Sequence, residues 1–351
     1  MNTSNNITKE ILTYFKNQNI DYDVYVIADT QQKTKDMYNF PHADESEFFS
    51  RSEFAEIASA IYYVFGYVRV FYSEIEFIEY YLKQKINNSE CIVINFARDG
   101  RANGKKSLIP SFCDLMKIRY TGSNGFVISL LRNKSIYTEY LHSNKIVTPK
   151  SMLYTGEESF ENIYNNFECE KVIVKNPFES ASIGLTKKNI FAFDAASKNI
   201  LCKLSETMNC KELLIQNYID GIECEVLVLQ FKGQYYALDP IEIVFKEKME
   251  YIDTEISNTY NYNFRLLDSS LKEQVCSAAI KSAKLLGIKD YARFDFRIKD
   301  RIPYLFDIAG TPYTIYHSSI AYLFREHFKL SYESIYKVIV SCMLSNYTIL
   351  D

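Results

Sequence analysis

The chain has 351 residues, 47% of them hydrophobic, and a formal net charge of −4 at pH 7. This length allows two or three domains with a substantial core. The mild negative charge and the lack of a basic block argue against nucleic-acid binding. The sequence has neither a basic start followed by an apolar run nor a long uncharged apolar stretch, so we expect a cytoplasmic protein that does not bind membranes.

The N-terminal third is typical of an open α/β domain, which we place at residues 1–124. Hydrophobic periodicity predicts helices and strands that alternate along it. The predicted helices are 7–17 and 47–65, and the predicted strands are 22–29, 68–71 and 91–96.

The rest of the chain is predicted to form two further domains. Residues 125–216 contain a β-branched strand that begins at Lys171, and residues 217–351 are expected to form a large antiparallel sheet. Helices are predicted in the last domain at 270–286 and 331–344. The fold class is therefore α/β in the broad sense, with an α+β C-terminal part.

Two short strands near the C-terminus each carry an acid that a core strand would not need. Tyr291–Arg297 contains Asp295, and Tyr304–Tyr313 contains Asp307. A hairpin would place the two carboxylates side by side, next to Arg293. Paired carboxylates suit a Mg²⁺ that bridges nucleotide phosphates, because Mg²⁺ prefers hard oxygens and takes only one or two from carboxylates. A salt bridge between Arg293 and an acid would explain the same residues equally well.

A candidate phosphate site lies further upstream. The strand Lys171–Lys175 ends in a lysine and runs into Asn176–Gly184, a loop rich in small residues. The Lys175 ammonium and the backbone N–H groups of this loop can surround phosphate oxygens. The loop is not a Walker loop, because it lacks the required Gly-Lys-Ser/Thr spacing.

The segment Glu212–Val226 is typical of two strands joined by a short connection. Gln216 and Asn217 could meet an adenine edge, and the Glu223 carboxylate could accept the ribose hydroxyls. Each of these residues alone is better explained as a polar surface residue. The order of the groups along the chain is what supports the nucleotide interpretation.

This order of groups resembles the ATP-grasp superfamily and, within it, the D-alanine–D-alanine ligase family, from about residue 45 onward. Ile118–Ser123 is similar to the family's Pro-Tyr-Thr-Gly-Ser segment, and Arg132-Asn-Lys134 is similar to its Asp-Lys pair. The resemblance implies a three-domain ATP-grasp architecture with the nucleotide in the cleft between the central and C-terminal domains. It also implies ATP and Mg²⁺ as cofactors and a homodimer.

The resemblance further implies roles for individual residues. The residues implied to bind ATP are Lys134, Lys175, Gln216, Asn217, Ile219 and Glu223. Asp295 and Asp307 match metal-ligand positions, and Arg293 matches the arginine that contacts the transferred phosphate and the oxyanion. Lys175, Arg293 and Glu47 form the implied catalytic set.

Two residues resemble the family's substrate contacts. Ser318, in the pair His317-Ser318, matches the serine that holds the carboxylate of the second amino acid, with Arg293 close to the reacting carbonyl. Glu47 matches the glutamate that binds the ammonium group of the first amino acid. The same glutamate could instead only cap the helix predicted at 47–65.

Several positions depart from the family pattern. Ala309 cannot ligate a metal, and Asp307 is one methylene shorter than glutamate, so one Mg²⁺ site must be weaker or completed by water. Ala181 stands where the family has the serine linked to the amine-binding glutamate. The family's His-Gly is replaced within residues 95–100, and no Lys-Tyr lid matches near residues 253–257. These changes put D-alanine as the substrate in doubt.

Three functions follow as alternatives. The first is an ATP-dependent carboxylate–amine ligase of specialised metabolism, which forms a dipeptide-like amide through an acyl phosphate. Its substrates would be small carboxylates and amines, and these would be amino acids if Glu47 and Ser318 keep the family roles. The second is a housekeeping D-alanine–D-alanine ligase. The third, suggested by Ala309, is a catalytically weak nucleotide-binding or partner protein.

Overall fold

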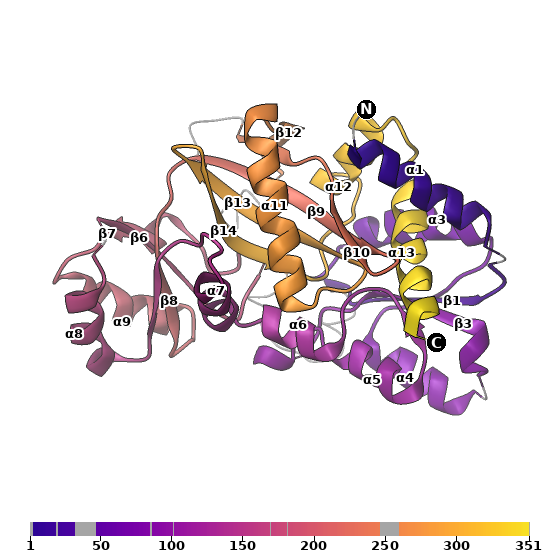
Figure 1. Ribbon diagram of the computed structural model, residues 1–351. Helices are drawn as coiled ribbons and strands as arrows, with labels where there is room; N and C mark the ends of the chain where they lie inside the picture. Colours follow the sequence, from indigo (N-terminus) through magenta and orange to yellow (C-terminus); the bar gives the residue numbers. More distant parts are fainter. Residues whose placement is uncertain are drawn as a thin grey trace.

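The computed structural model describes residues 3–18, 20–31, 47–84, 86–100, 102–168, 170–180, 182–245 and 260–350. Within these ranges the strands form three sheets. Figure 1 shows the sheet of β6 to β8 on the left, that of β9, β13 and β14 in the centre, and that of β1 and β3 on the right. The second sheet extends one residue past the predicted bound of 216, and the domain boundaries stay a prediction.

The first sheet is parallel, with strand order β2-β1-β3-β4. Its strands are β1 (Asp23–Ala28), β2 (Arg69–Phe71), β3 (Cys91–Phe96) and β4 (Arg119–Tyr120). Its helices are α3 (Arg51–Phe65), α4 (Glu74–Lys83) and α5 (Leu108–Met116). Alternate residues of β1 pack against α3 on one face and against α4 and α5 on the other. Burial on both faces explains why every residue of β3 is buried and all but Asn95 are apolar.

The second sheet is antiparallel, with strand order β5-β8-β6-β7. Its strands are β5 (Ser151–Tyr154), β6 (Lys171–Lys175), β7 (Ile190–Ala192) and β8 (Leu213–Asn217). Helices α8 (Glu157–Asn166) and α9 (Ser197–Thr207) contribute Phe160, Ile163, Leu201 and Leu204 to its core. The helices cover one face and leave β6 and β8 free to present polar side chains on the other.

The third sheet is the largest, with strand order β12-β11-β9-β13-β14 and β10 paired to β9. Its strands are β9 (Ile222–Phe231), β10 (Gln234–Ala237), β11 (Ile241–Phe245), β12 (Tyr262–Leu266), β13 (Tyr291–Lys299) and β14 (Ile302–Ala309). Helix α11 (Ser269–Leu286) packs on one face, and α13 (Ser334–Leu350) with α1 (Thr3–Lys16) packs on the other. All pairings in this sheet are antiparallel.

Helix α13 also contributes Tyr336, Val340 and Met343 to the core of the first sheet. It is thus buried between two sheets, which accounts for a sequence that is apolar on nearly every side. The connection from the first sheet to the second consists of α6 (Gly125–Leu131) and α7 (Lys134–Ser143). The remaining short helices are η2 (Asn88–Glu90), η3 (Ala102–Gly104), η4 (Lys187–Asn189), α12 (Ser319–Tyr322) and η5 (Leu323–His327).

Most predicted elements match the structure within a few residues. One local prediction was wrong in a way that matters for the site. Helix α3 begins at Arg51 rather than at Glu47, because Ser50 accepts from the backbone N–H of Glu53 while the Glu53 side chain accepts from the N–H of Ser50. This capping box fixes the helix start. Glu47 therefore does not cap the helix.

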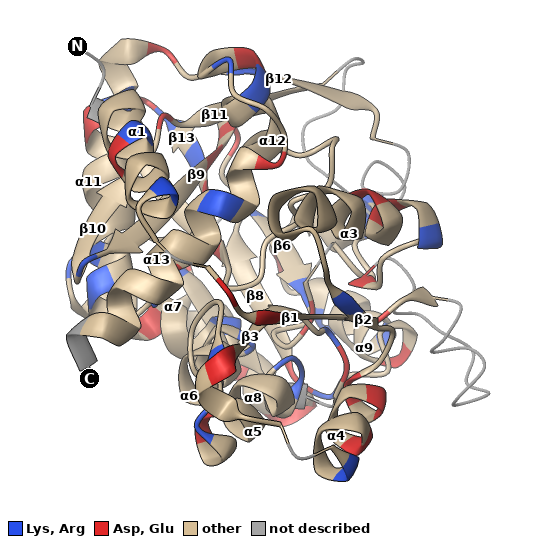
Figure 2. Cartoon of the chain, turned by 90° about the vertical axis from the view of Figure 1, so that its right-hand side faces the viewer, with Lys and Arg blue, Asp and Glu red and all other residues tan. Residues whose placement is uncertain are grey.

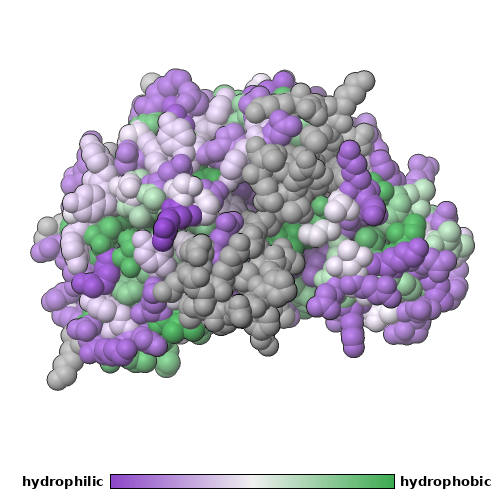
Figure 3. Space-filling model, turned by 180° about the vertical axis from the view of Figure 1, so that it is seen from behind, coloured by the Kyte–Doolittle hydropathy of each residue, from purple (hydrophilic) through white to green (hydrophobic). Residues whose placement is uncertain are grey.

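The surface has mixed character. Basic and acidic residues are interspersed over the described helices (Figure 2). Seen from behind, the described surface is largely hydrophilic and is interrupted by patches of hydrophobic groups (Figure 3). Among the described residues, no helix combines the length and the apolar character that crossing a membrane requires.

Candidate active site

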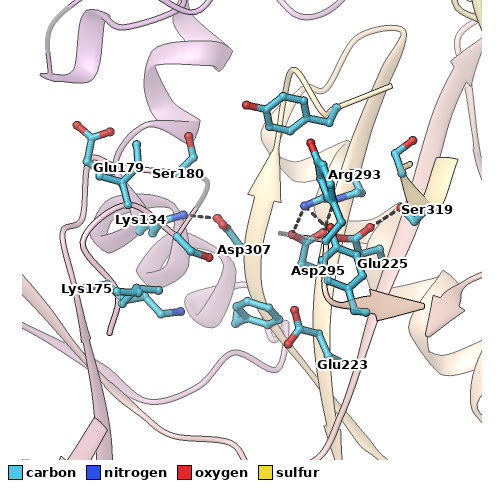
Figure 4. A pocket seen from close by; sticks show the side chains of 18 of the residues that line it. Lys134, Lys175, Glu179, Ser180, Glu223, Glu225, Arg293, Asp295, Asp307 and Ser319 are labelled. Carbon is cyan, nitrogen blue, oxygen red and sulfur yellow. Dashed lines mark hydrogen bonds and ion pairs between the residues drawn. The ribbon is translucent and has the colours of Figure 1, made fainter. Parts of the chain in front are cut away.

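A cavity of about 650 Å³ is lined by residues of both the second and the third sheet. All predicted site residues except Glu47 line it: Lys134, Lys175, Gln216, Asn217, Ile219, Glu223, Arg293, Asp295, Asp307 and Ser318. Figure 4 shows Lys134 and Lys175 on one side, Arg293, Asp295 and Glu225 on the other, and Asp307 between them. The fold thus brings together groups that are more than 180 positions apart in the sequence.

The acidic hairpin forms as the sequence predicts. Asp295 on β13 lies directly opposite Asp307 on β14, and the register shifts immediately after Asp295. Arg293 Nε and Nη2 donate to the two carboxylate oxygens of Asp295, each at 2.8 Å. Arg293 Nη2 also lies 3.1 Å from a carboxylate oxygen of Glu225. The salt-bridge alternative is therefore correct for Arg293, and both carboxylates still face the cavity.

Asp307 is held by groups from α7. Its carboxylate accepts from the Lys134 ammonium and, at 3.0 Å, from the Tyr137 hydroxyl. Burial alone would raise the pKa of Asp307, but Lys134 and then Lys175 outweigh it and lower that pKa. Asp307 is therefore a carboxylate at neutral pH, and it orients Lys134 toward the cavity.

Lys175 ends β6 inside the cavity, as expected. Its ammonium donates to Gln216 Oε1 at 3.1 Å and lies 4.9 Å from the centre of the Phe306 ring. Burial and the nearby charge of Lys134 lower the pKa of Lys175 to about 8. Two buried ammonium groups at one wall form a site that favours a polyanion.

Next to Lys175, the cavity has an apolar surface and polar groups that fit a nucleoside. Ile219 is buried and offers an apolar surface, and Gln216 Nε2 is buried with no acceptor among the described residues. A buried amide donor without a partner costs free energy, so it suits a ligand acceptor such as a purine nitrogen. Glu223 is buried as well and pairs with Arg297.

The residues present fit a Mg²⁺ that is shared with a nucleotide. Asp295 and Asp307 are two hard oxygen ligands on adjacent strands, and Ala309, which is paired with Arg293, adds none. No group of three or more histidine, cysteine or acidic residues in the described ranges is placed to hold a metal alone. Mg²⁺ commonly takes one or two protein carboxylates and completes its shell with phosphates and water. The donor set therefore matches this mode of binding.

Ser318 lines the cavity but has a structural role too. Its hydroxyl donates to the Ile315 carbonyl at 2.7 Å and accepts from the N–H of Ala321 at 3.1 Å, which caps α12. The neighbouring His317 ring contacts Tyr260 and Tyr262, with centroid distances of 4.9 and 5.5 Å. These rings lie beside Ser318. Its role in binding a carboxylate stays a prediction.

Glu47 lies in a separate, smaller cavity of about 90 Å³, which is also lined by Arg293 and Asp307. The carboxylate is completely buried. Lys105 and Lys106 each place an ammonium on it, at 2.6 and 2.5 Å. Arg132 Nη1 lies 3.2 Å away, and the Ser180 hydroxyl also donates to it.

The departure at Ala181 has a local counterpart. Ala181 itself lies outside the described residues, as do residues 253–257, where the family's lid was not recognised. Ser180, one position earlier, makes the hydrogen bond to Glu47 that the family pattern assigns to a serine of this loop. The loop thus keeps this contact from a shifted position.

Sequence reasoning missed several charged residues of the site. Glu225 is one: it follows Glu223 by two positions on β9, so the period of a strand places both on one face. Ser319 donates to Glu225, and burial raises the pKa of Glu225 to about 7. Lys105 and Lys106 gave no usable signal, because only long-range packing brings them to Glu47.

The three sheets and the cavity between two of them define a protein of the ATP-grasp class. The chain belongs to the family described as D-ala D-ala ligase C-terminus, whose model matches residues 144–341. The predicted fold class and family resemblance are thereby confirmed.

Curated relatives match about three fifths of the chain. The D-alanine–D-alanine ligase of Carboxydothermus hydrogenoformans is 28% identical over 207 residues, which is 56% of this chain and 64% of that protein. The D-alanine–D-alanine ligase of Flavobacterium psychrophilum is 26% identical over 216 residues, with 60% and 63% covered. The match thus spans less than two thirds of these relatives.

Solved structures resemble the chain over nearly its whole length. The D-alanine–D-alanine ligase of Bacillus anthracis complexed with ATP has a TM-score of 0.67 at 17% identity, covering 94% of this chain and 100% of that one. The D-Ala:D-Ser ligase VanG of Enterococcus faecalis has a TM-score of 0.66 at 15% identity, covering 92% and 99%. At this identity the likeness establishes the fold.

Proposed function

We propose that the protein is an ATP-dependent ligase that joins a carboxylate to an amine. The observation that carries this proposal is the single cavity in which Lys134, Lys175 and Arg293 face the carboxylates Asp295 and Asp307. Three cations beside two paired acids form a charge pattern that supports phosphoryl transfer. Membership of the family supports amide formation as the outcome.

In this proposal the acid substrate attacks the γ-phosphate of ATP. Lys134 and Lys175 hold the phosphate oxygens, and Arg293, which Asp295 and Glu225 fix in place, neutralises charge on the transferred group. The bond to the β-phosphate oxygen breaks and ADP leaves, so the products are ADP and an acyl phosphate, a much better electrophile than a free carboxylate. The amine then attacks it, Arg293 stabilises the oxyanion, and phosphate leaves.

The metal and the nucleoside have residues of their own in this scheme. Asp295 and Asp307 would hold a Mg²⁺ that neutralises charge on the phosphates when bound. Gln216, Asn217 and Ile219 would contact the adenine. The Glu223 carboxylate would accept hydrogen bonds from the ribose hydroxyls while it keeps its ion pair with Arg297.

The finer parts of the proposal concern substrates and assembly. Ser318 would receive the carboxylate of the amine substrate, so that the product is dipeptide-like. We place the activity in specialised metabolism, because Ala309 and the paired state of Glu47 differ from the pattern expected for D-alanine activation. We also propose a homodimer, which sedimentation of the purified protein would check.

The proposed activity is tested with hydroxylamine as a general amine. Purified protein with ATP, Mg²⁺ and a panel of small acids should form hydroxamates at a rate equal to phosphate release. Mass analysis with amino acids in place of hydroxylamine would then identify the natural amide. Hydrolysis of ATP without any hydroxamate, across the whole panel, would contradict the ligase assignment and favour a nucleotide-binding role.

We expect the affinity for a non-hydrolysable ATP analogue to weaken as the pH rises above 8. The pKa of Lys175 is lowered to about 8 by burial and by Lys134, and a bound polyanion raises it again. The complex therefore keeps a proton that the free protein loses above pH 8. The dissociation constant should increase by up to about tenfold per pH unit from there, as linkage requires. Calorimetry between about pH 7.5 and 9.5 measures it.

The Lys175→Arg variant is the matched control for this titration. A guanidinium keeps its charge throughout this range, so the variant should bind the analogue with little pH dependence. Equal pH dependence in both proteins would show that another group is responsible.

A further inference from the structure

The buried cluster around Glu47 carries more positive than negative charge. Lys105, Lys106 and Arg132 contact Glu47, and Lys105 and Arg132 also contact Glu179, each at 3.2 Å. When Lys106 carries its proton, three cations against two carboxylates leave an excess of one positive charge. Four of these five residues are at least nine-tenths buried, with Glu179 as the partly exposed one. Water therefore screens this excess only weakly.

The glutamate at the centre of the cluster is already neutralised. Each oxygen of Glu47 has a lysine ammonium within 2.6 Å, and Arg132 and Ser180 approach Oε1. The contact of Lys105 with Oε2 is an ion pair without hydrogen-bond geometry. An ammonium group of a substrate would have to displace these partners and would meet the remaining cations. Like charges placed together in a buried site are strongly unfavourable.

The cavity beside the cluster has room and donors for an anion. It measures about 90 Å³ and is lined by Arg98, Lys106 and Arg132 as well as by Arg293 and Asp307. Arg98 and Arg132 are 2% and 5% exposed, and within the described chain their Nε groups have no hydrogen-bond acceptor. These unpartnered donors favour a ligand that brings acceptor oxygens.

We propose that the acid activated by this protein is a small diacid, whose second carboxylate lies against Lys106, Arg132 and Arg98 where relatives of the family would hold an ammonium. This inference rests on the proposed ligase function, because it places the reacting carboxylate at Arg293. The small volume limits the donor to a few carbon atoms. Glu47 then serves as the fixed counter-charge of the cluster and does not touch the substrate.

The basicity of Lys106 agrees with this assignment. Burial lowers the pKa of Lys106 to about 7, and the neighbouring Arg132 and Arg98 act in the same direction against Glu47. An arriving carboxylate opposes these effects and restores the lysine's charge. The positive charge of the cluster is therefore better balanced when an anion is bound than when none is bound.

Four acids of one carbon skeleton test the proposal directly. Alanine, lactate, propanoate and methylmalonate differ only in the group on Cα, which is an ammonium, a hydroxyl, a hydrogen or a carboxylate. With ATP, Mg²⁺ and hydroxylamine, methylmalonate should be activated with a kcat/KM at least about a hundredfold above that of alanine, since the site rejects the like charge. Preference for alanine, or equal use of all four acids, would overturn the proposal and leave the ligase function standing.

Binding gives a second readout that does not depend on turnover. In the presence of a non-hydrolysable ATP analogue, calorimetry should detect binding of methylmalonate, and no binding of alanine at the same concentration. Failure to detect methylmalonate would overturn the proposal. Failure of the analogue itself to bind would instead count against the proposed function.

Two variants separate the cluster from general effects. Lys106 has φ +68°, a conformation that asparagine tolerates, and Lys106→Asn should reduce the preference for methylmalonate over alanine at least about tenfold. Lys329 has φ +55° and a side chain that is 75% exposed and lines neither cavity, so Lys329→Asn should leave the preference unchanged. An unchanged preference in a folded Lys106→Asn variant would overturn the proposal.

Discussion

Replacing Asp295 with asparagine should lower kcat/KM for the ligase reaction by at least about a thousandfold. The substitution keeps the size of the side chain but removes one of the two carboxylates that line the cavity together with Lys134 and Lys175. It also removes the bidentate partner that orients Arg293. Each of these changes takes away a preorganised charge interaction, and losing one such interaction costs about 10²- to 10³-fold. Phosphate release measured as a function of ATP concentration and of Mg²⁺ concentration shows whether the loss of the carboxylate or the loss of Arg293 orientation dominates.

The turn of the same hairpin supplies a matched control. Asp300 is exposed and has φ +50°, which asparagine adopts readily. Asp300→Asn makes the same chemical change on the same hairpin without touching the cavity, so its kcat/KM should equal that of the unaltered protein. If Asp295→Asn retained full turnover while its circular dichroism was unchanged, the metal assignment would be wrong.

Local sequence information was sufficient for much of the fold and for the pairing of the two acidic strands. The strand Cys91–Phe96 has the bounds that its mainly apolar sequence predicted. The two acidic strands pair in the register that sets Asp295 opposite Asp307. In these cases the decisive contacts lie within a strand or across a hairpin, so the spacing of residues in the sequence fixes the geometry.

The partners of Glu47 could not be predicted in the same way. Glu47 meets Lys105 and Lys106 across almost 60 positions of the chain, and Ser180 across 133. No spacing rule connects such residues, and a resemblance transfers only the role of Glu47 in other proteins. What differs here is the set of partners. These become visible only when the segment before α5, the end of α6 and Ser180 are placed in space.

Glu47→Gln should reduce the free energy of unfolding by about 3–5 kcal/mol, which is the cost of removing one partner from a buried ion pair. The glutamate is completely buried, and its loss leaves two lysines and one arginine without their main counter-charge. Urea unfolding followed by circular dichroism measures the effect. Glu79→Gln is the control, because Glu79 forms an exposed i,i+4 pair with Lys83 and its replacement should cost less than about 1 kcal/mol.

The pH dependence gives this prediction a second check. Burial alone would raise the pKa of Glu47, but Lys106, Arg132 and Lys105 outweigh it and lower that pKa well below its usual value of 4.5. A carboxyl group with a lowered pKa contributes stability that is complete above its unfolded-state value and is lost as the pH falls through its folded-state value. The difference in stability between the unaltered protein and Glu47→Gln should therefore shrink as the pH falls below about 4.5. A variant as stable as the parent at pH 7 would show that the cluster does not need this charge, and the cations around Glu47 would then require another explanation.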